Sequence, residues 1–254
     1  MVLTEEHLAR VFKALSDPNR LRIFDLLTFN DRSNSELMAE LGLSQNLLSH
    51  HLSVLADAGL VTVHQSVGDA RRRYYSANLD AMIGVQGWFR DHTPVSRLPL
   101  PALAHPRRVL FLCLHNAARS LMAEAIARHI APQALDAISA GLEPGGAPPE
   151  LAFQVLAERG VSAQDLRQRT YDEVESITFD FVIAVCDHVH ERIDRRRLRA
   201  GEYLHWSLVD PADLTDDLAG QLAETRRLYD RLVARIAVFV QRLAEQEAGP
   251  SPAA

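Results

Sequence analysis

A proline-rich segment divides this chain into two parts whose hydrophobic patterns differ. Residues 94–106 contain four prolines, which exclude both a helix interior and a central β-strand. We interpret this segment as a linker between one domain at residues 1–93 and a second at residues 107–246. Residues 247–254, EAGPSPAA, are expected to form a disordered tail.

The composition is that of a globular protein, with 47% hydrophobic and 24% charged residues. No apolar run approaches the ~20 residues that cross a bilayer, and the first residues are acidic where a secretory signal is basic. The two cysteines, Cys113 and Cys186, are too few for a disulfide framework. We therefore expect a cytoplasmic protein whose cysteines are either buried core residues or reactive thiols.

The first domain combines short helices with one hairpin. Hydrophobic spacing predicts helices at residues 35–41 and 44–58. Two extended runs, residues 60–66 and 71–77, follow them and flank a turn near Gly68. This order predicts a mainly α-helical winged helix-turn-helix with a β-hairpin wing.

The second of these helices and the wing supply candidates for DNA contacts. A winged helix-turn-helix places its second helix in the major groove and its wing along the phosphate backbone. The polar and basic side chains in these places are Ser44, Gln45, Asn46, Ser49, His50, Arg71, Arg72 and Arg73. Residues 1–93 carry 9 basic and 11 acidic residues, so DNA binding would depend on a local basic patch centred on the three arginines. The alternative is a helical interaction module whose arginines are only solvated.

Residues 4–92 closely resemble the ArsR family of winged-helix repressors, through LSQNLLSHHLSVLADAGLV and GDARRRYYSAN. The resemblance implies a homodimer that leaves double-stranded operator DNA when a metal or metalloid binds, with residues 44–52 as the recognition helix. Many arsenic sensors of the family carry a cysteine pair in the preceding helix, and this sequence has none. Asp91 and His92 match the zinc ligands of the family poorly. We therefore expect no metal site in this domain.

Beyond the linker, buried strands alternate with helices. RRVLFLC, LDAISAG and FDFVIAVCD have strand patterns, whereas LMAEAIARHI, PPELAFQVLAERG and residues 218–243 have helical spacing. Strands that alternate with helices predict an α/β domain with a parallel sheet. Ligands of such sheets bind beyond the carboxyl ends of the strands, and Cys113 lies at such an end.

The loop after Cys113 predicts an oxyanion site. The free N–H groups and positive dipole end of the following helix suit a tetrahedral oxyanion and favour a cysteine thiolate. Arg119 offers a planar guanidinium for two oxyanion oxygens, and Ser120 offers a hydroxyl for the sulfur. Asn116 is suited to holding the loop open through side-chain hydrogen bonds. The expected oxyanion-binding loop comprises Leu114, His115, Asn116, Ala117, Ala118 and Ser120. The alternative is an inert buried cysteine beside a surface arginine.

The second domain resembles the low-molecular-weight protein tyrosine phosphatases, a superfamily that includes thiol-dependent arsenate reductases. The resemblance covers residues 107–243 and includes the segments SAGLEP and DPADL besides the cysteine loop. It implies a parallel sheet of the phosphatase type and no tightly bound cofactor. It further implies that Cys113 is the nucleophile, Arg119 the oxyanion clamp and Asp210 the general acid.

Cys186 is the residue that distinguishes a reductase from a phosphatase. A reductase needs a second thiol, which resolves the thiol-bound arsenic and releases arsenite as a disulfide forms. Cys186 ends a predicted parallel strand and is therefore expected at the same sheet edge as Cys113. VCDH and HNAARS resemble the reductase branch, and Ala212 and Asp213 stand where phosphatases tend to have tyrosines. The alternative for Cys186 is an inert core thiol.

Together, the two resemblances imply an arsenic-responsive transcriptional repressor fused to an arsenate reductase. Two alternatives stay open: a protein tyrosine phosphatase fused to a regulator, and a repressor whose second domain only senses an oxyanion. The expected partners are operator DNA, arsenate or phosphate, and a second copy of the chain, with no membrane. Thioredoxin-coupled reductases often have a third cysteine where this chain has Ile193. Thioredoxin, mycoredoxin or a low-molecular-weight thiol is expected as the external reductant.

Overall fold

The computed structural model describes residues 4–66, 69, 71–92, 100–143, 145 and 150–248. It divides the chain into two compact units, Met1–Pro99 and Leu100–Ala254. The turn expected near Gly68, residue 93 at the expected end of the first domain, and residues 94–99 of the expected linker lie outside the described residues. In this part of the chain, none of the helices has both the length and the hydropathy that a membrane span needs.

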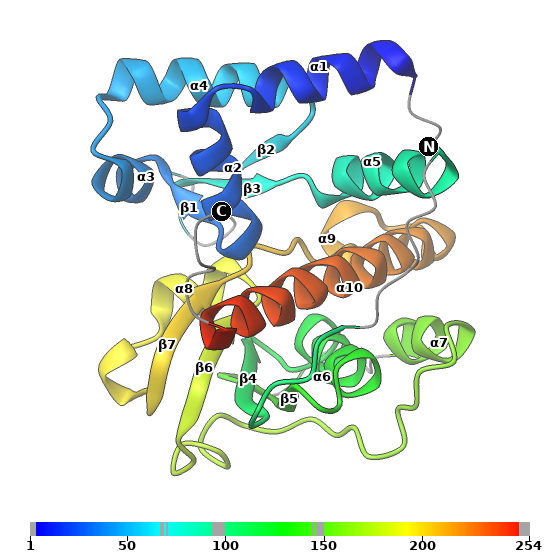
Figure 1. Cartoon of the computed structure of the whole chain (residues 1–254). Helices are drawn as coiled ribbons and strands as arrows, with labels where there is room; N and C mark the ends of the chain where they lie inside the picture. The colour runs from blue at the N-terminus through cyan, green and yellow to red at the C-terminus, as the bar shows by residue number, and fades with distance from the viewer. Residues whose placement is uncertain are drawn as a thin grey trace. The chain divides into compact units, whose positions relative to one another are not determined.

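The first unit is mainly helical. It contains the helices α1 (Glu5–Leu15), α2 (Pro18–Phe29), α3 (Asn34–Leu41), α4 (Gln45–Asp57) and α5 (Leu79–His92) and the strands β1 (Arg32–Ser33), β2 (Val61–Gln65) and β3 (Arg73–Ala77) (Figure 1). The strands pair antiparallel in the order β1-β3-β2. The predicted helix-turn-helix and wing are confirmed, with β1 as an additional short strand. Arg71 and Arg72 precede β3, although the sequence pattern placed them within it.

Local capping fixes where the helices of the first unit begin and end. The Asp17 carboxylate accepts hydrogen bonds from two N–H groups in the first turn of α2, at 2.9 and 3.1 Å. Ser33 and Glu36 form a reciprocal capping box at the start of α3. Gly42 ends α3 with φ 66°, a left-handed conformation that glycine adopts without steric cost. The turn between α3 and α4 therefore follows from local sequence.

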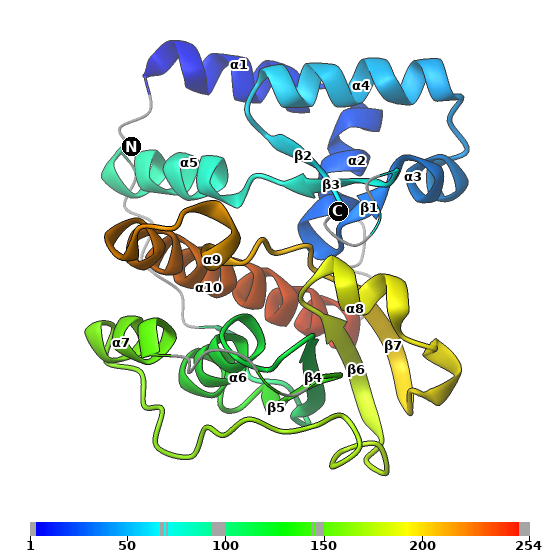
Figure 2. The same ribbon diagram turned by 180° about the vertical axis from the view of Figure 1, so that it is seen from behind.

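The second unit is an α/β domain. Its elements are β4 (Arg107–Cys113), α6 (Arg119–Ile130), β5 (Leu135–Gly141), α7 (Glu150–Glu158), β6 (Phe179–Ala184), α8 (Asp187–Arg192), the 3-10 helix η1 (Arg195–Arg197), β7 (Ala200–His205), α9 (Pro211–Leu214) and α10 (Leu218–Ala248). The four strands are parallel and lie in the order β5-β4-β6-β7 (Figure 2). The predicted parallel sheet is confirmed, whereas β7, α8 and α9 were not indicated by the sequence pattern.

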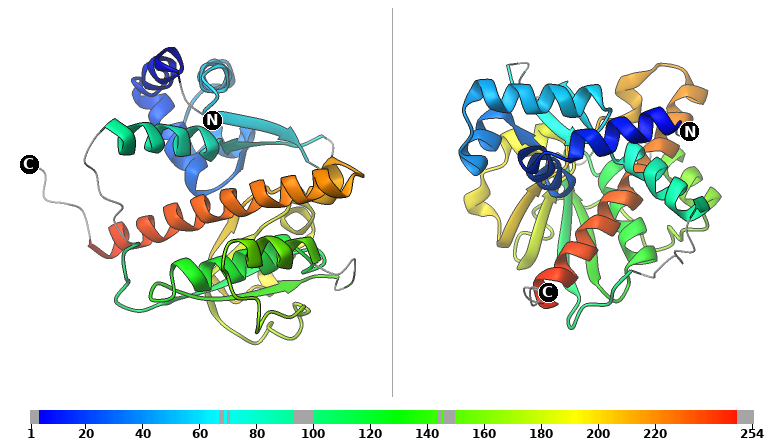
Figure 3. Two further views of the ribbon diagram at one scale, coloured as in Figure 1. Left: turned by 90° about the vertical axis from the view of Figure 1, so that its right-hand side faces the viewer. Right: turned by 45° about the horizontal axis from the view of Figure 1, so that its top comes forward.

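The long helix α10 packs its apolar side on this sheet and runs beside α6 (Figure 3). Phe239 of α10 meets Phe181 of β6 edge to face, with ring centroids 5.0 Å apart, and also contacts Trp206. The helix continues to Ala248, beyond the expected domain end at residue 246. Glu247 in its last turn pairs with Arg107 at 2.8 Å. The carboxyl end of the helix is thereby joined to the start of β4.

Candidate functional site

Cys113 ends β4 at the carboxyl edge of the sheet, and the loop of residues 114–118 joins it to α6. Its side chain is buried. The Sγ atom lies 2.8 Å from Oγ of Ser120 and accepts a hydrogen bond of 3.0 Å from the backbone N–H of Asn116. Donors at this distance stabilise a negative charge on sulfur, as a nucleophilic cysteine requires.

The loop after Cys113 contains several backbone N–H groups without an acceptor among the described residues. Helix α6 begins at Arg119 without a side-chain cap, so the N–H groups of its first turn have no intrahelical acceptor. The N–H groups of His115, Ala117 and Ala118 donate to no acceptor among the residues that the structure describes. Free N–H groups gathered at a helix N-terminus bind tetrahedral oxyanions. These N–H groups lie in the loop where the sequence predicts an oxyanion cradle, and oxyanion binding there stays a prediction.

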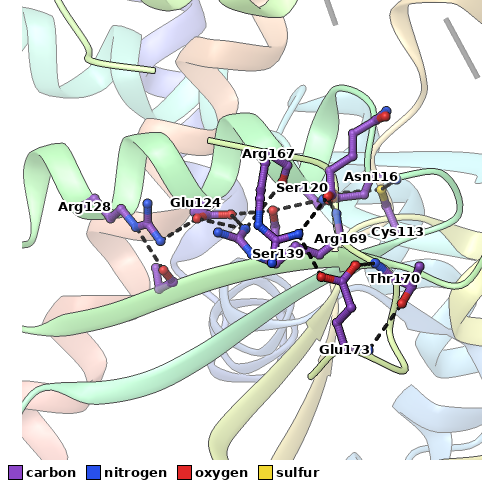
Figure 4. A network of polar contacts seen from close by, with 12 residues as sticks. Cys113, Asn116, Ser120, Glu124, Arg128, Ser139, Arg167, Arg169, Thr170 and Glu173 are labelled. Atoms are coloured by element: carbon purple, nitrogen blue, oxygen red, sulfur yellow. Dashed lines mark hydrogen bonds and ion pairs between the residues drawn. The ribbon is translucent and has the colours of Figure 1, made fainter. Parts of the chain in front are cut away.

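Asn116 lies at the centre of a buried hydrogen-bond network (Figure 4). It has a left-handed backbone with φ 51°, and its side-chain amide donates to Oγ of Ser120 and to Oγ of Ser139, both at 2.9 Å. Its carbonyl oxygen accepts from the backbone N–H of Arg169 at 2.7 Å. Each polar atom of this side chain is therefore tied to a different part of the fold. No local sequence pattern connects Ser139 or Arg169 with the loop.

Gly141, at the end of β5, allows the cysteine loop to approach the neighbouring strand. A Cβ atom at this position would lie 2.9 Å from the backbone of each of Leu114, His115 and Asn116. Real Cβ atoms do not come this close to backbone, so only glycine fits without a shift of the loop. Gly141 belongs to the SAGLEP segment, and the structure supplies a steric reason for glycine there.

Arg119 and Asp210 form an ion pair, with 2.9 Å between Nη2 and Oδ2. A second arm of the guanidinium donates to the backbone oxygen of Leu208 at 2.9 Å. Burial by itself lowers the pKa of Arg119, but electrostatic interactions with Cys186, Asp210 and Cys113 outweigh it and raise this pKa above its usual value. Asp210 is the N-cap residue of α9, and its side chain is 30% exposed. The cation and the carboxylate thus meet beside the cradle.

Cys186 is the N-cap residue of α8, just beyond the end of β6. Its thiol is buried and forms no disulfide. Burial raises the pKa of Cys186; Arg119 lowers it, Cys113 raises it further, and the backbone N–H groups of Val189 and Leu114 lower it. Strands β4 and β6 are parallel neighbours, with Leu112 opposite Ala184, and the N–H of Val185 donates to the oxygen of Leu112 at 2.8 Å. The structure therefore brings the two thiols of the chain to one edge of the sheet.

A second buried polar cluster fixes the turn that carries Cys186. The carboxylate of Asp187, the next residue, accepts from Nε2 of His205 at 3.0 Å and from the hydroxyl of Ser207. The ring of His190 stacks on that of His205 with centroids 3.8 Å apart. This cluster was not predicted because β7, which supplies His205, has no clear strand pattern in the sequence. Among the described residues, no three His, Cys, Asp or Glu side chains form a metal-binding group.

The candidate DNA-binding residues lie on two exposed surfaces of the first unit. In α4 and at its N-cap, the exposed candidates are Ser44, Gln45, Asn46, Ser49 and His50. On the wing, Arg71, Arg72 and Arg73 are exposed, with the side chain of Arg71 96% accessible. The carboxylate of Asp69 lies 3.9 Å from Arg71 and 3.6 Å from Arg72, and so reduces the local positive charge.

Comparison with known proteins divides the chain in the same way. The family model for low molecular weight phosphotyrosine protein phosphatases matches residues 108–248, and that for bacterial regulatory proteins of the arsR family matches residues 17–63. An arsenate reductase of Halalkalibacterium halodurans is 29% identical over 133 residues, which are 52% of this chain and 94% of that protein. An arsenical resistance operon repressor of Staphylococcus xylosus is 38% identical over 64 residues, which are 25% of this chain and 62% of that protein.

Among solved structures, a tyrosine phosphatase of Erwinia amylovora is similar to the second unit. The similarity covers 55% of this chain and 95% of that one, at 22% sequence identity and a TM-score of 0.44.

Proposed function

We propose a function for each unit from the premise that the chain belongs, over residues 108–248, to the low molecular weight phosphotyrosine protein phosphatase family. Residues 17–63 contribute a regulatory domain of the arsR family. The proposal is an arsenic-responsive transcriptional repressor fused to a thiol-dependent arsenate reductase. The observation that carries the enzymatic part is the position of the two buried thiols: Cys113 ends β4, and Cys186 follows the neighbouring parallel strand β6 at the same edge of the sheet.

The first chemical step forms a covalent adduct with arsenate. The Cys113 sulfur attacks arsenic, an As–S bond forms, and an As–O bond breaks. Asp210, once protonated, gives its proton to the departing oxygen, which leaves as water. Arg119 and the open N–H groups of the loop balance the negative charge of the oxyanion.

The second step uses Cys186 as the resolving thiol. Its thiolate attacks the Cys113 sulfur, an S–S bond forms, and the As–S bond breaks. The electron pair of that bond stays on arsenic, which leaves as arsenite, while the two thiols are oxidised to a disulfide. Because burial raises the pKa of Cys186, this thiol must lose its proton before it can react. The step should therefore accelerate as the pH rises.

An external thiol must then return the disulfide to two thiols. The chain contains no further cysteine that could carry the disulfide to the surface, and position 193 is isoleucine. We therefore assign the reduction to thioredoxin, mycoredoxin or a low-molecular-weight thiol acting directly on the Cys113–Cys186 bond. This requirement for a pool of reduced thiols places the reaction in the cytoplasm.

The same cradle also supports phosphatase chemistry, since Cys113, Arg119 and Asp210 suffice for transfer of a phosphoryl group. The distinguishing experiment compares arsenate reduction, supplied with thioredoxin or a small thiol, with hydrolysis of an aryl phosphate. Cys113→Ser should abolish both activities. Cys186→Ser and Cys186→Ala should abolish arsenate reduction and leave aryl-phosphate hydrolysis.

Each of the other outcomes would favour a different function for the second unit. Arsenate reduction at the wild-type rate by both Cys186 variants would exclude the resolving role. Hydrolysis of the aryl phosphate without any arsenate reduction by the wild type would favour a tyrosine phosphatase. Binding of phosphate without turnover of either substrate would favour a sensor domain.

For the first unit we propose binding to a palindromic operator as a homodimer. The exposed polar residues of α4 would contact base edges in the major groove, and the arginines at residues 71–73 would contact phosphates. A two-fold symmetric protein reads half-sites about one helical turn apart, so a short palindromic duplex should bind two copies of the chain.

A further inference from the structure

We infer that Arg169 is a positioning residue of the oxyanion loop, which it holds in shape through an ion pair with the buried carboxylate of Glu124. The inference rests on the proposed function only in that residues 113–119 bind an oxyanion. It assigns a role to a side chain that lies far from the loop in sequence and does not touch the reacting atoms. It also explains why a charged residue occupies the interior of α6.

The starting observation is that the Glu124 carboxylate is completely buried within α6. A buried carboxylate is stable only when cations and hydrogen bonds replace its water shell. Two arginines meet it here: Nη1 of Arg169 lies 3.1 Å from Oε2, and Nη2 of Arg128 lies 2.5 Å from Oε1. The hydroxyl of Ser139 adds a hydrogen bond of 2.5 Å to Oε2. Figure 4 shows these groups gathered around Glu124.

These contacts close into a ring that includes the loop. Ser139 accepts from the side-chain amide of Asn116, whose carbonyl oxygen accepts from the backbone N–H of Arg169. The side chain of the same arginine then returns to Glu124. The side chain of Asn116 is thus bonded to the Ser139 hydroxyl and to the Arg169 backbone amide. The Glu124 carboxylate in turn binds the Ser139 hydroxyl and the Arg169 side chain. Its left-handed backbone directs an N–H group at Cys113.

The backbone around Arg169 is also fixed against the end of β5. Its carbonyl oxygen accepts from the N–H of Gly141 at 2.9 Å, and the N–H of Tyr171 donates to the oxygen of the same glycine at 2.8 Å. Glu173 accepts from the N–H of Thr170 at 2.9 Å. A shift of the Arg169 side chain would therefore move the backbone N–H of the same residue, and with it the side chain of Asn116.

Arg128 provides a matched comparison because it neutralises the same carboxylate without contacting the loop. It lies one helical turn after Glu124 in α6, and its other hydrogen bond goes to the backbone oxygen of Ala137. Its side chain is 40% exposed, whereas that of Arg169 is 11% exposed. Loss of either arginine removes one positive charge beside Glu124. Only loss of Arg169 also removes the side-chain anchor of the residue whose backbone N–H binds Asn116.

The experiment measures phosphate binding to the full-length protein by calorimetry, together with thermal unfolding of each variant. Arg169→Gln should weaken phosphate binding by about 10-fold or more, because a displaced loop N–H loses its hydrogen bond to the charged phosphate. Arg128→Gln should change it by less than about 2-fold, although both variants lose thermal stability. Arg169→Lys keeps the charge beside Glu124, so it should recover most of the affinity for phosphate. If Arg169→Gln does not fold, phosphate binding is compared between Arg169→Lys and the wild type instead.

Equal effects of Arg169→Gln and Arg128→Gln on phosphate binding would overturn the inference, and so would wild-type affinity in Arg169→Gln. Failure of Arg169→Lys to bind better than Arg169→Gln would overturn it as well. Phosphate binding needs neither Cys186 nor a reductant. A protein that binds phosphate but does not reduce arsenate would therefore refute the proposed reductase and leave this test intact.

Discussion

Replacing Gly141 by alanine is the smallest change that we expect to disable the oxyanion loop. The new Cβ would lie 2.9 Å from three backbone atoms, N of Asn116, C of His115 and O of Leu114. Ordinary van der Waals contacts of a Cβ begin at 3.4 Å, so the loop and the end of β5 must separate by at least about 0.5 Å. None of the three atoms belongs to a flexible side chain that could rotate away.

The loop is the part that should move, because the backbone of Gly141 is held on both sides. Its strand pairs with β4, and it exchanges backbone hydrogen bonds with Arg169 and Tyr171. Overpacking of this kind costs ~1–3 kcal/mol, which a domain with the usual ~5–15 kcal/mol of stability survives. Displacement of reacting groups by ~1 Å lowers rates by about 10²-fold. We therefore expect a folded variant that has lost about 10- to 100-fold in kcat/KM for an aryl phosphate.

The assay combines aryl-phosphate hydrolysis, inhibition by phosphate and thermal unfolding. Gly160→Ala is the matched control: Gly160 has φ +70°, and a Cβ there would meet no atom within 4 Å. The control should lose roughly 1–2 kcal/mol of stability through backbone strain and keep its activity and its inhibition by phosphate. Wild-type kcat/KM and phosphate inhibition in Gly141→Ala would refute the argument that close approach to β5 shapes the loop.

Three further predictions concern the other parts of the two sites. Replacing all three arginines at residues 71–73 by alanine should weaken binding to every DNA sequence and flatten the salt dependence by up to about three units, measured by fluorescence anisotropy; an unchanged slope would remove the wing from the interface. Because burial raises the pKa of Cys186, disulfide formation in a single turnover with arsenate should accelerate about tenfold per pH unit between about pH 7 and 9. A flat profile would mean that loss of the Cys186 proton does not limit the step. Asp187→Asn should slow arsenate reduction more than aryl-phosphate hydrolysis, because its carboxylate fixes the Cys186 turn; equal losses would indicate a general structural role.

The elements that the sequence predicted well are those whose signals are local. The strand that ends at Cys113 is a continuous apolar run, and α4 begins and ends at residues with strong capping or stop preferences. Some short elements were not predicted because they carry no such local signal. Strand β7 begins with Ala200, Gly201, Glu202 and Tyr203, which are exposed or half-buried, and α9 has only four residues, so neither produces a hydrophobic period.

The residues of the site that could be predicted are those that carry chemistry at a strand end. Cys113 and Arg119 belong to one strand–loop–helix unit, and the structure brings Asp210 to the same guanidinium. Glu124 could not be found in this way. A glutamate four residues before an arginine on a helix normally indicates a surface pair, and its burial depends on Arg169, which lies 45 residues further along the chain. Only the fold brings the two together.

The last prediction concerns communication between the two units. Residues 1–99 contain no cysteine, so a thiol-based arsenic signal must originate at Cys113 and Cys186. Coupling between sites is typically worth ~1–3 kcal/mol, or about 5- to 150-fold in affinity. The prolines of residues 94–106 favour the low end of this range, because a tethered domain can act independently. We expect arsenate or oxidation to weaken operator binding about 5- to 10-fold.

Operator binding by the full-length chain would be titrated with arsenate, arsenite and an oxidant. The comparison is with a variant that carries both Cys113→Ser and Cys186→Ser, which keeps the fold of the second unit and removes its thiols. The double variant should stay bound to DNA where the wild type is released. If both are released identically, the cysteines do not carry the signal, because no other thiol exists in the chain. The effector would then have to bind the first unit through oxygen or nitrogen ligands, and the two units would act independently.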